Sequence, residues 1–355
     1  MSAKRVLVVG LGNMGMSHAR AYAGIDGFEV AAVCERGIAK RKLPPEISGA
    51  ARYADFGEAL AKTKPDVVSI NTYADTHADY AIRAMNAGAH VFVEKPLAET
   101  VKDAERVVEA ARRTGKKLVV GYILRHHPSW IEFIKIAQTL GTPLVFRMNL
   151  NQQSSGVAWE AHKRLLQSLS PIVDCGVHYL DVMCQITRAK PVRVHALGAR
   201  LTEDQPPGMY NYGHLQVAFD DGSVGWYESG WGPMMSETAY FVKDVIGPGG
   251  SVSIVMQETA GDGKSADINA HTKTNRILLH HSELKANGEL AKKDEFFDTA
   301  DEPDHDELCA REQRFLLKAI DEDIDLTDHM DDAVKSLRIV LAADQSVREG
   351  GVVAL

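Results

Sequence analysis

The chain has 355 residues, of which 45% are hydrophobic and 25% charged, and its formal net charge is −8. One hydrophobic core rarely serves so long a chain, so we expect two domains. No block rich in Lys or Arg is present, which argues against a nucleic-acid partner or an anionic membrane surface. No apolar run approaches the roughly 20 residues of a membrane span. The four cysteines form no CxxC pair, so we expect reduced thiols in a cytoplasmic protein.

Residues 1–125 alternate short apolar runs with helical runs. The expected strands are RVLVVG, FEVAAVCE, ARYAD, PDVVSINT, HVFVEKP and KLVVGY. The expected helices between them are MGMSHARAYAG, FGEALAKT, THADYAIRAMNAG and TVKDAERVVEAARRTG. Strands separated by helices require crossover connections, and these give a parallel sheet. We therefore predict an α/β domain with a doubly wound parallel sheet, the Rossmann arrangement.

Residues 126–355 have a different pattern. The run HPSWIEFIKIAQTLG predicts a linking helix, and LVFRMNLNQQ, VRVHALGARLT, GHLQVAF and SVGWYESGW predict long strands. Tight turns in AFDDGSVGW and IGPGGSVSI join neighbouring strands, so this α+β domain should hold a mainly antiparallel sheet. We expect a helix at DCGVHYLDVM and two closing helices at HDELCAREQRFLLKAID and DDAVKSLRIVLAADQSV. Residues 258–305 are polar and strand-poor at their edges.

The segment VLVVGLGNMGMSHA contains Gly10, Gly12 and Gly15 as a GxGxxG motif between a strand and a helix. In such a loop the first glycine makes the turn, the second lets a pyrophosphate approach the backbone, and the third lets helix pack on strand. The helix N-terminus then receives the phosphates. We predict dinucleotide binding here, with Asn13 and Met14 also at the cofactor. A tight turn without a ligand is the alternative.

An acidic residue stands where a ribose would be held. Glu35 follows FEVAAVC, about twenty residues beyond the last glycine, and a carboxylate at that place accepts from both ribose hydroxyls of NAD. Arg36 is adjacent, and Arg41 and Lys42 are near, so a 2′-phosphate also has possible partners. We predict NAD as the cofactor, with Arg36 at the site, and leave NADP open.

A lysine follows the fifth expected strand. HVFVEKPLAET places Lys95 at the carboxyl end of that strand, where ligands of open α/β sheets bind. Partial desolvation there would lower its pKa and suit it to proton handling. The alternative is a surface lysine that pairs with Glu94.

The helix SPIVDCGVHYLDVM presents Asp174, His178 and Asp181 within roughly 60° of one another, on a stripe separate from its apolar residues. Ser170 is a candidate N-cap and Pro171 a good first helical residue. The stripe alone fits a solvated face, an acid–base pair or a metal site. A catalytic metal needs three or four convergent ligands, and no HExxH or paired CxxC motif supplies them, so we predict none.

Together, GLGNMG, THADYAIRAMNAGAHVFVEKPLA, GYILRHHPSW and DCGVHYLD resemble the Gfo/Idh/MocA family of glucose–fructose oxidoreductase and inositol dehydrogenase relatives. The resemblance covers essentially the whole chain. It implies a second domain with a large open sheet, whose face commonly packs against other subunits. We accordingly expect a homodimer or homotetramer. It also implies a cis bond between Lys95 and Pro96. The segment QSLSPIV replaces a glycine-rich stretch of many relatives, which puts substrate identity in doubt.

The resemblance also implies site residues. Lys95, Asp174 and His178 would carry catalysis. Thr72, His77 and Glu94 lie where relatives contact the cofactor, and Arg125 lies near cofactor and substrate, although an inter-domain salt bridge fits it equally well. Trp159 is a candidate apolar wall for a sugar face, or else core packing.

Oxidation of a secondary alcohol requires hydride transfer to the cofactor and removal of the hydroxyl proton, and these steps suggest a role for each catalytic residue. His178 would be the general base, Asp174 would orient it and hold a neighbouring hydroxyl, and Lys95 would stabilise charge on the reacting oxygen. We predict an NAD(P)-dependent dehydrogenase of a sugar, sugar derivative or cyclitol. A metabolite-binding protein of the same fold, and a redox-neutral sugar lyase or hydrolase with tightly held NAD, remain alternatives.

Overall fold

The computed structural model describes residues 3–237, 241–255, 265–267, 274, 276–299 and 302–355. The chain forms two compact units, one of Met1–Ile123 with Pro303–Val334 and one of Leu124–Glu302 with Lys335–Leu355. The boundary predicted from the sequence lies between residues 125 and 126, and that prediction includes C-terminal helices that can pack back on the first domain. The first unit includes residues 303–334 because helix α10 (His305–Asp321) packs against helix α1 (Asn13–Gly24).

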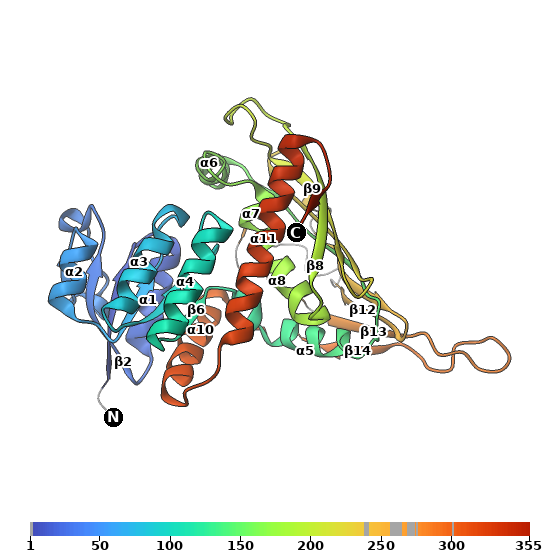
Figure 1. Cartoon of the computed structure of the whole chain (residues 1–355), viewed down its shortest axis with the longest axis horizontal. Helices are drawn as coiled ribbons and strands as arrows, with labels where there is room; N and C mark the ends of the chain where they lie inside the picture. The colour runs from blue at the N-terminus through green and yellow to red at the C-terminus, as the bar shows by residue number, and fades with distance from the viewer. Residues whose placement is uncertain (1–2, 238–240, 256–264, 268–273, 275, 300–301) are drawn as a thin grey trace. The chain divides into compact units, whose positions relative to one another are not determined.

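The first unit is built on a six-stranded parallel sheet (Figure 1). Its strands are β1 (Lys4–Val9), β2 (Phe28–Cys34), β3 (Ala51–Tyr53), β4 (Val67–Ile70), β5 (His90–Val93) and β6 (Leu118–Val120). The strand order is β3-β2-β1-β4-β5-β6 and every pairing is parallel, which confirms the doubly wound sheet. Strand order reverses beside β1, and ligands of such sheets bind beyond the carboxyl ends at that point.

Helices of the first unit occur where the periodicity predicts them. They are α1, α2 (Phe56–Thr63), α3 (Ala74–Asn86), α4 (Val101–Thr114), α10 and the beginning of α11 (Thr327–Glu349). Two further short helices, η1 (Ile38–Lys40) and η2 (Pro45–Ile47), were not predicted. Side chains of Asp55 and Thr100 cap the N-termini of α2 and α4. Gly115 ends α4 in the left-handed conformation that glycine adopts without steric cost.

The second unit holds a nine-stranded sheet. Its strands are β7 (Val145–Gln153), β8 (Pro191–Ala199), β9 (Tyr212–Phe219), β10 (Val224–Gly232), β11 (Lys243–Gly247), β12 (Gly250–Val255), β13 (Arg276–His281), β14 (Glu295–Asp298) and β15 (Val353–Ala354). Their order is β14-β13-β12-β11-β7-β10-β9-β8-β15. The pairings are antiparallel except that of β7 with β10, which confirms a mainly antiparallel sheet. A long crossover separates β7 from β10, and it allows their parallel pairing.

That crossover contains three helices. They are α6 (Gly156–Leu165), α7 (Pro171–Asp174) and α8 (Gly176–Thr187), while α5 (Pro128–Ala137) precedes β7 and η3 (Ile123–His126) leads into α5. Helices α5, α7 and α8 pack on strands of the sheet. Side chains of β9 and β12 alternate between buried and partly exposed positions. One face of the sheet is therefore covered while the other remains accessible, as expected for an open sheet.

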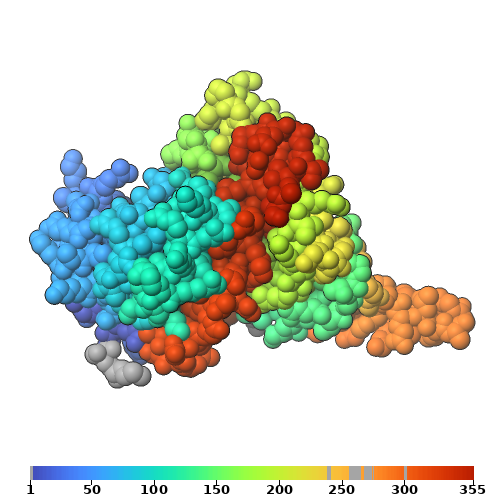
Figure 2. All heavy atoms as spheres, in the orientation of Figure 1, coloured from blue at the N-terminus to red at the C-terminus, as the bar shows by residue number. Residues whose placement is uncertain are grey.

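Strands β13 and β14 lie in the region that sequence analysis judged strand-poor. Their connection, residues 282–294, is largely exposed and extends from the sheet as a narrow projection (Figures 1 and 2). Residues 256–264 and 268–273 of the same region lie outside the described residues. In the part of the chain that the structure describes, no helix is long and apolar enough to cross a membrane.

Candidate active site

The glycine loop has the geometry that a bound pyrophosphate requires. Gly10 has a φ of +80°, and a Cβ there would lie 2.6 Å from the carbonyl O of Asn71. A Cβ on Gly15 would lie 1.9 Å from the carbonyl O of Gly10, so α1 can pack on β1 only with glycine there. A Cβ on Gly12 would meet no atom of the described residues within 4 Å. The open space at Gly12 is where a phosphate would approach the backbone.

The residues that follow Gly12 begin helix α1. Asn13 is exposed and Met14 is partly buried, and among the described residues no side chain caps the helix N-terminus. The first N–H groups of the helix are thus available to an anion, whose charge the positive end of the helix dipole favours. The loop fits the diphosphate of NAD.

The acid at the end of β2 is neutralised by a neighbouring cation. Nη1 of Arg41 donates to Oε1 and Oε2 of Glu35, at 2.8 and 2.9 Å, and Nη2 of Arg41 donates to the carbonyl O of Leu11 in the glycine loop. Arg36 is exposed. The predicted ribose-binding acid is therefore fixed beside the glycine loop by Arg41, not by Arg36.

The loops after β4 and β5 are held together by one histidine. Nδ1 of His77 lies 2.7 Å from the carbonyl O of Pro96, and Nε2 lies 3.0 Å from the carbonyl O of Thr72. Burial lowers the pKa of His77. The imidazole of His77 therefore connects these two loops. Thr72 is partly exposed, and its hydroxyl lies 2.6 Å from the hydroxyl of Thr76.

Glu94 and Lys95 point to different environments. Glu94 is buried, and its carboxylate lies 2.8 Å from Nε2 of His18 and accepts from the backbone N–H of Lys95 at 3.1 Å. Lys95 is partly exposed at the carboxyl end of β5, and its bond to Pro96 is cis, as the resemblance implies. The structure thus places the lysine where a ligand can reach it and the glutamate in the interior.

In the second unit, Asp174 and His178 are the accessible residues of a buried segment. The hydroxyl of Ser170 accepts from the N–H of Val173 at 3.2 Å and caps α7, which begins with Pro171. The single helix expected over residues 171–183 is instead two helices, α7 and α8, which meet at Cys175. From 171 through 184, only Asp174 and His178 are partly exposed, and every other residue is buried.

Asp181 has a supporting position. Its carboxylate accepts from Nε of Arg125 at 2.8 Å and from Nη2 at 2.6 Å, and Gln185 donates to it at 2.9 Å. Asp181 is 1% exposed. Arg125 belongs to the second unit, so this ion pair lies within one unit and is not the inter-domain bridge that sequence analysis considered.

A group of polar residues beside Asp174 was missed by sequence analysis. His162 stacks on Trp231, with ring centroids 4.6 Å apart, and its Nδ1 lies 2.9 Å from the hydroxyl of Ser154. The indole N–H of Trp231 donates to Gln152 at 2.9 Å, and the thiol of Cys175 lies 3.4 Å from the same oxygen. Burial lowers the pKa of His162 to about 4, an effect that the charge of Asp174 opposes.

The sequence does not predict this group because its residues are far apart along the chain. These side chains come from the ends of β7 and β10 and from α6 and α7, and only the parallel pairing of β7 with β10 brings them together. Trp159, on α6, is 9% exposed and has the ammonium of Lys163 over its ring at 5.9 Å. It contributes mainly to packing. Lys95 belongs to the first unit and Asp174 and His178 to the second, so their convergence stays a prediction.

Two family models match the chain. Residues 4–122 match the Gfo/Idh/MocA oxidoreductase family, described as an NAD-binding Rossmann fold. Residues 135–252 match the Gfo/Idh/MocA C-terminal domain. Among curated proteins, inositol 2-dehydrogenase of Salmonella typhimurium is 31% identical over 182 residues, which are 50% of this chain and 52% of that protein. The match thus spans about half the length of the curated inositol dehydrogenases.

A longer match and two solved structures extend the comparison. D-glucoside 3-dehydrogenase of Escherichia coli is 24% identical over 79% of this chain and 88% of that protein. Scyllo-inositol dehydrogenase of Lactobacillus casei, solved with NAD(H) and scyllo-inositol, superposes with a TM-score of 0.75 at 17% identity and covers 99% of both chains. The WlbA dehydrogenase of Bordetella pertussis, with NADH and UDP-GlcNAcA, has a TM-score of 0.75 at 18% identity and covers 100% of this chain and 99% of its own. At these identities the structures support the fold.

Proposed function

The chain belongs to the Gfo/Idh/MocA oxidoreductase family, and on this premise we propose that it is an NAD-dependent dehydrogenase that oxidises a secondary hydroxyl of a sugar, sugar derivative or cyclitol. One observation carries the proposal. In the buried segment 171–184, the accessible side chains are one carboxylate and one imidazole, Asp174 and His178. A surface helix would expose a whole polar face, whereas this segment exposes an acid–base pair alone.

The first unit holds the cofactor. Gly12 leaves space for the diphosphate, the N-terminus of α1 offers N–H donors, and Glu35 accepts from the ribose. NAD, when bound, supplies the acceptor for the hydride that leaves the substrate carbon. Lys95, partly exposed at the end of β5, donates to the substrate oxygen and stabilises the charge that develops there.

The second unit supplies the base. His178 removes the hydroxyl proton, since imidazole is the side chain whose unperturbed pKa is nearest neutrality. Asp174 holds the ring in orientation and favours its protonated form once the proton has transferred. Asp181 supports Arg125 from the interior and does not take part directly. His162, partly exposed and stacked on the buried Trp231 beside Asp174, is the member of that group that a sugar could reach.

The test is a panel of aldoses, sugar acids and inositols with NAD⁺ and NADP⁺, followed by nicotinamide absorbance. Lys95→Ala and His178→Ala should each reduce kcat by about a hundredfold or more while NADH affinity changes less than threefold. Partly exposed His280 offers a matched control, and His280→Ala should retain full rate. A near-wild-type rate for His178→Ala would overturn the base assignment. Sugar turnover without NADH accumulation would show that the reaction is redox-neutral and not a net oxidation.

The accessible sheet face supports assembly into a homodimer or homotetramer. Val145, Val224 and Ile246 are aligned across β7, β10 and β11, and they are 39%, 46% and 38% exposed. An apolar row on an open sheet is more stable when another surface covers it. Sedimentation velocity of wild type and of Val224→Lys tests this proposal, and an unchanged monomer for both would refute it.

A further inference from the structure

Helix α10 carries three potential metal ligands on one face. His305, Cys309 and Glu312 are spaced four and then three residues apart, which aligns them along the helix. Their exposures are 6%, 0% and 1%. A stripe of this kind would ordinarily be apolar where it packs on a neighbouring helix, and here it meets α1, which contributes His18. The proposed function does not use these residues.

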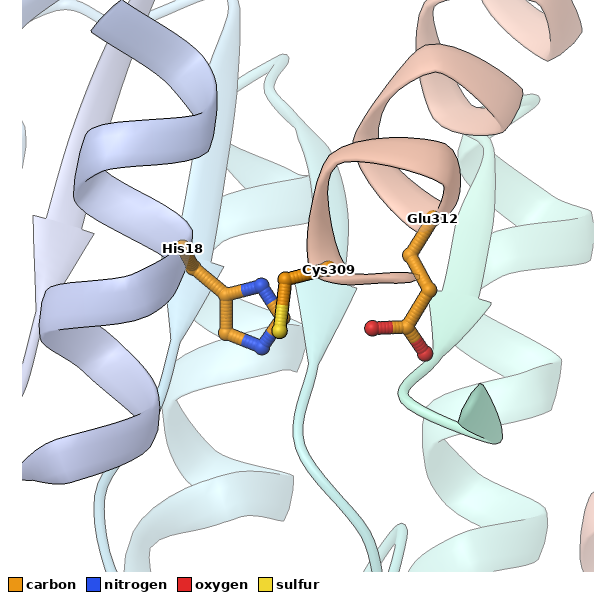
Figure 3. Close-up of side chains that lie close together, drawn as sticks. All are labelled: His18, Cys309 and Glu312. Atoms are coloured by element: carbon orange, nitrogen blue, oxygen red, sulfur yellow. The ribbon is translucent and has the colours of Figure 1, made fainter. Parts of the chain in front are cut away.

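The ligand atoms converge. One nitrogen of His18, the sulfur of Cys309 and one carboxylate oxygen of Glu312 all lie within 4.8 Å of one another. Figure 3 shows the thiol of Cys309 beside the ring of His18, with the carboxylate of Glu312 turned toward them from the next turn of α10. The same sulfur lies 3.8 Å from the ring nitrogens of His305. Three donor atoms thus lie close together in the interior, and the ring of His305 adjoins their sulfur side-on, since both of its nitrogens are equally far from it.

Hydrogen bonds fix which nitrogen of His18 has a lone pair. Nε2 lies 2.8 Å from the carboxylate of Glu94, and because a carboxylate only accepts, Nε2 carries the hydrogen. Nδ1 therefore accepts from Nε2 of Gln313 at 3.0 Å, so its lone pair faces α10 and would exchange this amide for the metal ion on binding. A histidine that ligates a metal commonly donates its other N–H to a carboxylate in this way.

The charges of the group suit a divalent cation. A thiol ligates as thiolate and a carboxyl as carboxylate, so Cys309 and Glu312 would together bring two negative charges to the ion. These charges would balance those of a divalent cation. The loaded site would be neutral, which is what a buried position requires.

We propose that His18, Cys309 and Glu312, joined by His305 once its ring turns a nitrogen toward them, form a structural site for one tetrahedral transition-metal ion of the zinc class. Two imidazoles, a thiolate and a carboxylate match the ligands of zinc, and four protein ligands leave no open position for catalysis. Sulfur and nitrogen donors exclude magnesium and calcium. Ligand atoms in a zinc tetrahedron lie roughly 3.5 Å apart, so the side chains close in by about 1 Å on binding. The ion would tie α10 to the helix that follows the glycine loop.

Metal analysis of the purified full-length chain tests the site. The protein is incubated with ZnCl₂, dialysed without chelator, and its zinc measured by inductively coupled plasma mass spectrometry. A His280→Ala/His281→Ala background removes two partly exposed histidines, each beside an acid, that would bind zinc adventitiously. We expect one zinc per chain in that background and a higher Tm with zinc than with EDTA. Reconstitution with Co²⁺ should give a thiolate-to-cobalt charge-transfer band.

Variants show which residues hold the ion. Cys309→Ser and Glu312→Gln should each weaken zinc affinity at least tenfold and remove the cobalt band or shift it. Cys184, buried in the second unit, provides the matched control, and Cys184→Ser should keep both zinc and band. The proposal would be overturned if the histidine-depleted background bound less than a tenth of an equivalent of zinc and its Tm did not change with zinc. Should the cluster variants fail to fold, a cobalt complex without a thiolate band would overturn it equally.

Discussion

Arg41 donates two hydrogen bonds to the carboxylate of Glu35, at 2.8 and 2.9 Å, at the place where a dinucleotide's adenosine ribose would lie. An isolated carboxylate there would repel the 2′-phosphate of NADP, whereas a carboxylate paired with arginine repels it less. This ion pair is about one third exposed, so solvent moderates its effect.

Arg41→Ala should therefore sharpen the preference for NAD. We expect the ratio of NADP⁺ to NAD⁺ in kcat/KM to fall by about tenfold, because a cation that meets the 2′-phosphate is lost while Glu35 remains. Fluorescence titration with NADH and NADPH separates this effect from catalysis. Lys40→Ala, a change at an exposed neighbouring cation, serves as control. Equal losses for both cofactors would contradict the role given to Arg41.

Breaking the Arg125–Asp181 pair should affect stability more than chemistry. Asp181→Asn leaves Arg125, whose side chain is 13% exposed, with a neutral partner, and loss of one member of a buried ion pair costs about 3–5 kcal/mol. Urea unfolding measures this cost, with Glu58→Gln in the exposed Lys62–Glu58 pair as a control that should change stability by less than about 1 kcal/mol. A kcat loss for Asp181→Asn as large as that for Asp174→Asn would show that Asp181 participates directly.

The fold of the first unit was predictable from the sequence because its hydrophobic periodicity and its glycine motif indicate the same strand-and-helix order that the structure has. Most of its strands are short apolar runs that alternate with helical periods, β3 being a short, largely exposed exception, and Gly10, Gly12 and Gly15 mark the first turn. In the second unit, β13 and β14 were not recognised, because their side chains are largely partly exposed or exposed and lack a buried stripe. A strand held at a sheet edge by backbone pairing leaves little trace in its composition.

The site was predictable only where a motif lies on one segment. Asp174 and His178 share one stripe, but the break at Cys175 depends on how α7 and α8 pack and left no signal in the periodicity. His162 and Trp231 meet through strand pairing, which a single sequence does not reveal. On α10, the positions of His305, Cys309 and Glu312 are those of an ordinary buried helix stripe. Only the packing of α10 on α1 brings His18 beside them.

Acid should destabilise the second unit through His162. Its folded pKa of about 4 is below the ordinary value of 6.5, so between these values the unfolded chain binds more protons than the folded one. Stability therefore falls as pH drops from about 6.5 to 4, by at most about 3 kcal/mol from this group. His162→Gln should reduce the difference between urea unfolding at pH 7.5 and at pH 5. A pH dependence identical to that of wild type would show that other groups control acid unfolding.

Two glycines of one loop should fail in different ways when replaced by alanine. Gly15→Ala places a methyl group 1.9 Å from the carbonyl O of Gly10, a distance that no real Cβ contact reaches, so α1 must move away from β1. We expect Gly15→Ala to lose more than about 2 kcal/mol of unfolding free energy and, with it, NAD binding. The Cβ of Gly12→Ala meets no atom within 4 Å in the described part of the chain, and this variant should fold with stability within about 1 kcal/mol of wild type.

The NAD affinity of Gly12→Ala then shows whether the open volume at Gly12 serves ligand binding and not folding. If the open volume at Gly12 is where the diphosphate approaches the backbone, the added methyl group should raise the Kd for NADH by at least about tenfold, measured by fluorescence titration at a temperature where both proteins are folded. Gly24→Ala, at the other end of α1 and also without a neighbour within 4 Å, is the matched control and should bind NADH normally. Normal NADH affinity in Gly12→Ala would place the phosphates elsewhere, because a methyl group on that backbone cannot coexist with a pyrophosphate in contact with it.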